Sequence, residues 1–147
     1  MKLETEYTHI FHYCFYRLGN KEDAEDVTQE TFLRYLQHPE YQGNYERQYL
    51  YKIAKNLCVD TLRKNKNQSN IFQEETTSSN ELDIFEKTAL KIAISELTEE
   101  EREIIILRFV NQENLTVIAK IFGISRFTVS RKIHTITKKL KNKLREE

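Results

Sequence analysis

The chain is poor in residues that break helices or build covalent frameworks: its 147 residues include one proline, three glycines, two cysteines and no tryptophan. Because proline and glycine interrupt helices and supply most tight turns, this scarcity predicts a nearly all-helical fold. Cys14 and Cys58 are too few and too far apart for a disulfide framework or a Cys-x-x-Cys metal site, and we expect reduced, buried thiols. No apolar run approaches the ~20 residues of a membrane span, and no signal peptide is evident. These absences predict a cytoplasmic protein.

Signatures of catalysis are also missing. The chain has no glycine-rich phosphate loop, no His-Glu-x-x-His zinc motif and no nucleophile elbow. His9 and His12 are three residues apart, but no third metal ligand follows at a helical spacing. The acidic clusters at residues 22–26 and 99–103 lie at predicted helix starts, where the helix dipole accounts for them. We therefore expect no enzyme activity, no metal and no cofactor.

Charge is balanced overall but not locally. The formal net charge is zero, with 23 basic and 23 acidic residues, yet residues 114–145 contain nine Lys or Arg and no Asp or Glu. A local basic field of this kind is typical of nucleic-acid binding, although it also fits a solvated amphipathic helix.

The same basic segment contains a helix-turn-helix pattern. Apolar residues from Leu115 to Phe122 recur at i, i+3, i+4 and i+7, Gly123 can end that helix in a left-handed conformation, and Ser125 can cap the next. The second helix has an apolar stripe from Val129 to Leu144. Its first turns fit the major groove of DNA. The predicted DNA-binding residues are Ser125, Arg126, Phe127, Thr128, Ser130, Arg131 and His134.

The sequence of the N-terminal third predicts two helices. The first covers residues 7–18 and ends at Gly19, and the second begins at the cap Asn20 and runs to Leu36. One face of the second helix is polar with a single apolar residue, which a partner protein explains better than solvent does. This face consists of Asp26, Gln29, Glu30 and Leu33.

The next segment mixes tyrosines with cations, after Pro39 stops the preceding helix. Aromatic rings interleaved with Lys and Arg suit single-stranded nucleic acid, because unpaired bases stack on the rings while the cations follow the phosphates. Half-buried core tyrosines explain the pattern equally well. The candidate residues are Tyr41, Asn44, Tyr45, Arg47, Tyr49, Lys52, Lys55, Asn56, Arg63 and Lys64.

The middle of the chain divides it into two parts. Residues 65–80 are polar and aperiodic, as in a linker. Beyond them, Asn80 can cap a helix over residues 81–95, and Thr98 with Glu101 forms a capping box for the next helix. We therefore expect an all-α protein of two small helical domains, residues 1–66 and 81–147, joined by a flexible linker at 67–80.

Two blocks together resemble a known family. Residues 23–32 (DAEDVTQETF) and 49–56 (YLYKIAKN), followed by Asp60 and Arg63, are similar to region 2 of the bacterial extracytoplasmic-function (ECF) sigma factors. Residues 97–144, with the helix-turn-helix, resemble region 4. The family usually has Trp where this chain has Tyr49, and Glu where it has Val117.

The resemblance implies a function for each part. The face of Asp26, Gln29, Glu30 and Leu33 is expected to dock on core RNA polymerase. The tyrosine- and cation-rich segment is expected to capture the unpaired −10 promoter element, and the helix after Ser125 to read the −35 element. The resemblance also allows an anti-sigma factor as a partner.

Two other classes remain open from the residues alone. A stand-alone helix-turn-helix regulator would bind duplex DNA as a dimer, but it has no need of the tyrosine-rich basic helix. A pure adaptor would bind a protein through the acidic helix and contact no DNA. The sequence predicts a sigma factor that directs promoter recognition, and it does not specify the promoter.

Overall fold

The computed structural model describes residues 3–41, 46–68 and 89–145, and every regular element in these ranges is a helix. The all-α prediction is confirmed. None of the described helices is long and apolar enough to cross a membrane. In chain order the elements are α1 (Leu3–Leu18), α2 (Lys21–Leu36), the 3₁₀ turn η1 (Pro39–Tyr41), α3 (Glu46–Gln68), a helical stretch at residues 89–95, α5 (Glu99–Ile105), the π-helical turn η2 (Ile106–Val110), α6 (Leu115–Phe122) and α7 (Arg126–Arg145).

The first three helices form a bundle whose turns follow the expected local signals. Gly19 ends α1 with a φ of 71°, a left-handed conformation that glycine adopts without strain. The Asn20 side chain then accepts a hydrogen bond from the backbone N–H of Asp23 at 2.8 Å, which caps α2. Cys14 and Cys58 are free thiols buried in the core of this bundle.

The C-terminal half contains the predicted helix-turn-helix. Gly123 ends α6 with a φ of 68°, and the Ser125 hydroxyl accepts a hydrogen bond from the N–H of Thr128 at 3.0 Å. Upstream, Thr98 and Glu101 form the predicted capping box at the start of α5. Both the turn and the caps depend on neighbours in sequence, which is why the sequence alone predicted them.

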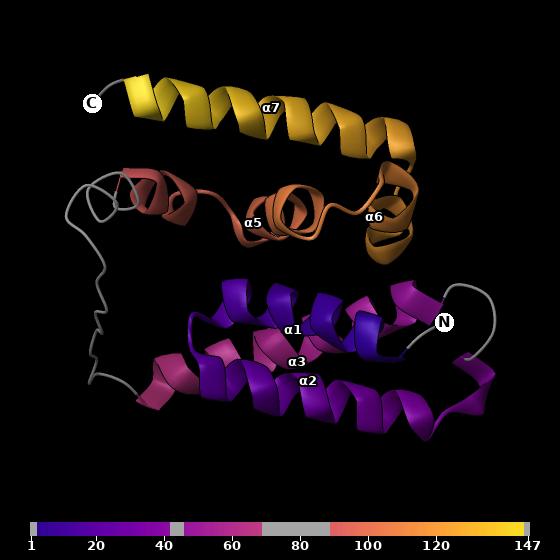
Figure 1. Ribbon diagram of the computed structural model, residues 1–147. Helices are drawn as coiled ribbons and strands as arrows, with labels where there is room; N and C mark the ends of the chain where they lie inside the picture. Colours follow the sequence, from indigo (N-terminus) through magenta and orange to yellow (C-terminus); the bar gives the residue numbers. More distant parts are fainter. Residues whose placement is uncertain (1–2, 42–45, 69–88, 146–147) are drawn as a thin grey trace.

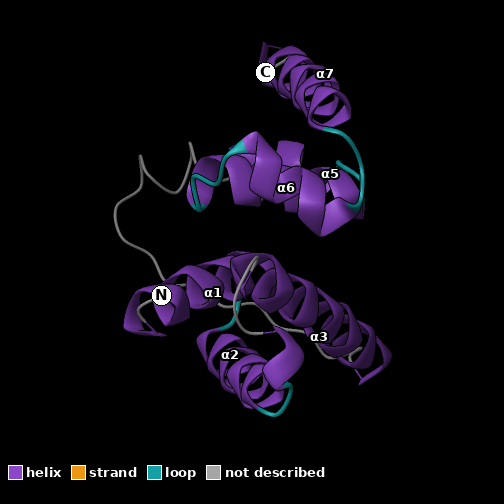
Figure 2. Ribbon diagram, turned by 90° about the vertical axis from the view of Figure 1, so that its right-hand side faces the viewer, coloured by secondary structure: helices purple, strands orange, loops and turns teal. Residues whose placement is uncertain are grey.

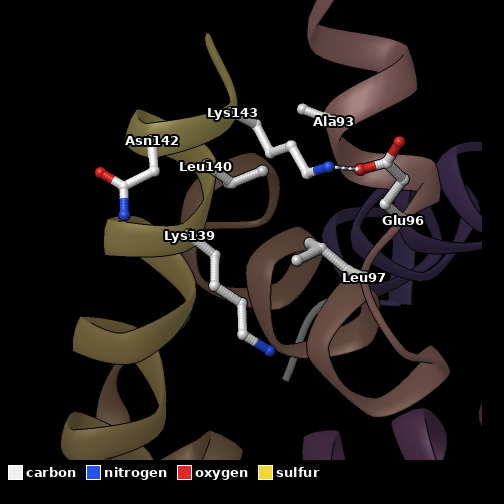
Figure 3. Close-up of a pocket in the computed structure, with 7 residues that line it drawn as sticks. All are labelled: Ala93, Glu96, Leu97, Lys139, Leu140, Asn142 and Lys143. Atoms are coloured by element: carbon white, nitrogen blue, oxygen red, sulfur yellow. Dashed lines mark ion pairs between the residues drawn. The ribbon is translucent and has the colours of Figure 1, made fainter. Parts of the chain in front are cut away.

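The far end of α7 is held by the segment before α5. Figure 3 shows Ala93 and Leu97 on one side of a small pocket and Leu140 on the other, with the Lys143 ammonium paired to the Glu96 carboxylate. This packing fixes the direction of α7, since the helix is anchored at its last turns as well as at the glycine turn.

The two halves are stacked on each other. The bundle of α1, α2 and α3 lies on one side, α5 and α6 lie in the middle, and α7 is outermost on the other side (Figures 1 and 2). A single cluster of buried apolar side chains includes members of both halves, among them Ile10, Leu50, Ile104 and Ile118. The expected linker at residues 67–80 lies almost entirely outside the described residues, although α3 continues through Gln68.

Candidate nucleic-acid and polymerase interfaces

The outward side of α7 carries the predicted duplex-binding residues. Val129 and Ile136 are buried beneath the helix, with 0% and 1% of their surface exposed. Most of the predicted residues are exposed, and Thr128, which is half-buried, shares the cap with Ser125. The exposed ones are Ser125, Arg126, Phe127, Ser130, Arg131 and His134.

The lysines on the flank of α7 serve a different purpose. The Lys132 ammonium lies 3.2 Å from a Glu100 carboxylate oxygen, and the Lys139 ammonium lies 2.7 Å from one of Glu101. The hydrogen bond from Lys139 lowers the pKa of Glu101, as does the backbone N–H of Thr98. These pairs hold α7 against α5.

The exposed basic side chains in the first turns of α7 have no such partners in the described part of the chain. Within the described ranges, Arg126, Arg131 and His134 take part in no ion pair. A basic side chain without an internal partner can bind a phosphate or a base edge without first breaking an ion pair within the protein. The outward side of α7 is therefore electrostatically available to an anionic duplex.

The predicted polymerase-binding face lies on α2. Asp26, Gln29, Glu30 and Leu33 are all exposed, and Leu33 has 56% of its surface accessible. This helix is the outermost element of the N-terminal bundle, on the opposite side of the molecule from α7 (Figure 2). Glu30 accepts a hydrogen bond from Arg34 at 3.0 Å, an exposed pair within one helix turn.

The predicted strand-binding residues on α3 divide into two groups. Lys52, Asn56, Arg63 and Lys64 are exposed, and Tyr49 is half-buried with the Lys52 ammonium 6.0 Å from its ring centre. Tyr41 ends η1, but its side chain lies outside the described part. Asn44 and Tyr45 also lie outside it.

The second group faces the C-terminal half instead. The Arg47 guanidinium binds both carboxylate oxygens of Glu6, at 2.9 and 2.7 Å, and reaches Glu113 at 3.3 Å. The Lys55 ammonium lies 5.6 Å from the ring centre of Phe122. In this arrangement both cations are occupied by contacts within the protein.

A buried ion pair joins the halves, which the sequence analysis missed. Arg17 of α1 donates hydrogen bonds to Glu103 and, at 2.9 Å, to Glu99 of α5. The side chains of Arg17 and Glu103 are 2% and 3% exposed. Burial raises the pKa of Glu103, although Arg17 and Lys55 favour its charged form. The available signal was Arg17 within the apolar stripe of the first helix, three and seven residues after Cys14 and Ile10.

A second polar cluster lies beside α3. The Tyr51 hydroxyl donates to Glu113 at 2.6 Å, and the Asn111 amide donates to the Tyr51 oxygen at 2.6 Å and to the His9 carbonyl at 2.8 Å. Burial raises the pKa of Tyr51 well above its ordinary value, so the phenol remains a donor. The π-helical turn η2 and the positive φ of Gln112, 56°, direct Asn111 and Glu113 toward the bundle. Tyr51 is thus a core residue.

Comparisons with known proteins identify the family. The family description sigma-70 region 2 matches residues 3–68, and sigma-70 region 4 matches residues 93–142. Among curated proteins, the RNA polymerase sigma factor SigV of Bacillus subtilis is 33% identical over 143 residues, covering 90% of this chain and 86% of SigV. The ECF sigma factor SigW of the same organism is 28% identical, covering 93% of this chain and 83% of SigW. The ECF sigma factor BldN of Streptomyces coelicolor is 30% identical, but the chain spans only 48% of its length.

Solved structures show the same fold. RpoE of Bartonella quintana, solved with the anti-sigma factor NepR, superposes with a TM-score of 0.72 at 20% identity, covering 97% of this chain and 94% of RpoE. CnrH, solved with the cytosolic domain of CnrY, superposes with a TM-score of 0.68 at 19% identity, and the match covers 95% of this chain and 82% of CnrH. A helical bundle followed by a helix-turn-helix unit is thus the fold that this chain shares with both solved structures. The chain belongs to the RNA polymerase sigma factors, and its relatives are of the ECF type.

Proposed function

We propose that this sigma factor divides promoter recognition between its two halves, with residues 1–66 and 81–147 as domains and 67–80 as their linker. The exposed face of Asp26, Gln29, Glu30 and Leu33 docks on core RNA polymerase in the cytoplasm. The protein itself contributes binding and positioning, and the polymerase contributes the chemistry. The observation that carries the proposal is the pair of exposed arginines without an ion-pair partner among the described residues at the start of α7, Arg126 and Arg131, on a helix whose Val129 and Ile136 are buried.

The −35 element is read by the first turns of α7. Arg126 and Arg131 can each reach a guanine edge with two hydrogen bonds, a contact that contributes roughly 1–3 kcal/mol against the wrong base. They can also bind phosphates, which fixes register without reading sequence. Ser130 and His134 lie on the same exposed side and extend the contact along the groove.

The −10 element is captured by the exposed side of α3. Tyr49 supplies a ring on which an unpaired base can stack, a contact that contributes about 1–3 kcal/mol. Lys52, Asn56, Arg63 and Lys64 supply cations and an amide along the strand. Lys55 joins this surface only when the C-terminal half moves away, because its ammonium lies against the Phe122 ring in the closed arrangement. Arg47 would then lose Glu113 but keep its two hydrogen bonds to Glu6 of α1, so it stays paired within the N-terminal half.

The spacing of the two promoter elements requires the C-terminal half to move away from the N-terminal bundle. The centres of the two elements are about 25 base pairs apart, which is roughly 85 Å at 3.4 Å per step. A packed chain of this length has a radius of gyration of about 15 Å and a diameter of about 40 Å. The closed arrangement therefore cannot contact both elements of a straight promoter at once, and the halves separate on the polymerase. A protein like NepR, the anti-sigma factor bound to RpoE, is the candidate for a partner that restrains this step.

The test is transcription in vitro from a library of genomic fragments, with core polymerase in the presence and absence of the protein. Promoter-specific transcripts that require the protein support the proposal, and their absence contradicts it. On a promoter so identified, Arg126→Ala with Arg131→Ala should weaken holoenzyme binding to closed duplex by tenfold or more, at ~1.4 kcal/mol per factor of ten. Initiation from a template already unpaired at −10 should be spared.

Two further variants sharpen this test. Tyr49→Ala with Lys52→Ala should do the reverse, leaving closed binding intact and impairing strand opening, which permanganate reactivity of unpaired thymines measures. Lys132→Ala is the matched control on α7, because this lysine pairs with Glu100 and lies away from the outward face. Equal loss of both steps in both double variants would show that the division of labour is wrong.

A further inference from the structure

Phe127 is the feature of α7 that charge does not explain. Its side chain is 75% exposed, the largest value among the exposed large apolar residues of the described ranges. The ring has no aromatic or cation partner in those ranges. A single exposed apolar side chain is common on protein surfaces, so its meaning depends on where it lies and on what surrounds it.

The position of Phe127 on the helix is well defined. At about 100° per residue, it lies some 180–200° around the axis from the buried Val129 and Ile136, directly away from the core. It is the second residue of α7, and the Ser125 cap holds this first turn through its hydrogen bond from Thr128. The ring is therefore presented by a rigid helix start and not by a loop.

Its neighbours indicate what it meets. Ser130, Arg131 and His134 lie within about 60° of Phe127 around the helix, and all are exposed. This surface attracts a polyanion, and the N-terminal residues of a recognition helix contact base edges in the major groove. A phenyl ring cannot form hydrogen bonds with those edges. The apolar feature that bases display there is the C5-methyl group of thymine.

We propose that Phe127 is a specificity-determining residue that recognises the C5-methyl group of a thymine in the −35 duplex. The inference rests on the proposed function of α7 and adds to it the base and the atom that this side chain reads. The arginines beside it supply attraction and guanine contacts, while Phe127 selects a thymine by burying its methyl group. Replacement of that thymine by deoxyuridine removes only this methyl group and leaves base pairing intact.

The test uses holoenzyme assembled from core polymerase and the full chain, on a promoter taken from the transcription library described above. Each −35 thymine is replaced in turn by deoxyuridine, and affinity for the closed duplex is measured. One substitution should weaken wild-type binding about three- to fivefold, as expected for one buried methyl group. For Phe127→Ala, the ratio of the affinity for the thymine duplex to the affinity for the deoxyuridine duplex at that position should fall to about one. Phe109→Ala is the matched control, since this phenylalanine is also exposed but lies in η2, outside α7, and should keep the wild-type ratio.

Each result decides between distinct explanations. A ratio that persists in Phe127→Ala, or no thymine that is sensitive to deoxyuridine, overturns the proposal while leaving the sigma activity intact. Weaker co-purification of Phe127→Ala with core polymerase, at an unchanged ratio, would assign the ring to a protein contact and also overturn it. A wild-type protein that directs no transcription would overturn the proposed function itself.

Discussion

The buried pair of Arg17 and Glu103 allows a sharp test of what holds the two halves together. Glu103→Gln keeps the shape of the side chain but removes its charge, which leaves the Arg17 guanidinium, 2% exposed, with only the exposed Glu99 as a counter-charge. Removal of one partner of a buried pair costs about 3–5 kcal/mol. Because Glu99 remains 2.9 Å away, we expect the lower end of that range.

This loss of free energy shifts the equilibrium between the closed form, in which the two halves are packed together, and an open form, in which they are apart. Separation of the halves returns Arg17 to water, so the variant can open instead of burying an unpaired charge. A change of 3 kcal/mol shifts this equilibrium by roughly 10²-fold, at 1.36 kcal/mol per factor of ten. Small-angle scattering of the full chain should show a radius of gyration above the ~15 Å expected of a packed chain of this length. Hydrogen exchange should accelerate along the facing sides of α1 and α5.

Two matched variants keep the test specific. Glu100→Gln removes an exposed pair with Lys132 within the C-terminal half, and such pairs contribute about 0–1 kcal/mol, so the radius should not change. Arg17→Met added to Glu103→Gln should restore much of the closed form, because no unpaired charge then remains buried. If Glu103→Gln lowers the melting temperature yet leaves the radius and the exchange pattern unchanged, the pair stabilises one half and does not join the two.

Two other predictions concern the outer surfaces. Gln29→Ala with Glu30→Ala should weaken binding to core polymerase about tenfold, at ~1.4 kcal/mol per factor of ten, while circular dichroism stays helical. Lys21→Ala, an exposed charge on the same helix but outside this face, is the control, and undiminished co-purification of the double variant would refute the docking face. The lowered pKa of Glu101, held down chiefly by Lys139, stabilises the fold above the unfolded pKa of about 4.3, and this contribution is lost as pH falls through the folded value. Glu101→Gln should therefore melt at a lower temperature than wild type at pH 7, with a gap that closes toward pH 3; a gap independent of pH would contradict this assignment.

Local signals in the sequence were sufficient for the helix caps, the glycine turns and the recognition helix, although α1 begins at Leu3, before the predicted residue 7, and α3 continues through Gln68 into the predicted linker. The Asn20 cap, the Thr98 capping box, the Gly123 turn and the Ser125 cap each join residues within a few positions of one another. Their hydrogen bonds depend on backbone geometry that those residues fix by themselves. The phase of α7 follows in the same way, because apolar spacing decides which side is buried and so which cations are left outward.

The contact between the halves was decided only by the tertiary structure. The sequence predicted two domains on a loose tether and assigned Arg47 to strand capture, whereas the structure shows it bound by Glu6 and Glu113. Arg17 and Glu103 are 86 positions apart, and nothing local to either residue indicates the other. A charged side chain in an apolar stripe shows that a partner is needed, but the choice of partner depends on how the helices pack. Local hydrogen bonds and periodicity therefore determined the elements and their outward faces, while apolar packing and the buried Arg17–Glu103 pair between distant helices determined how the two halves meet.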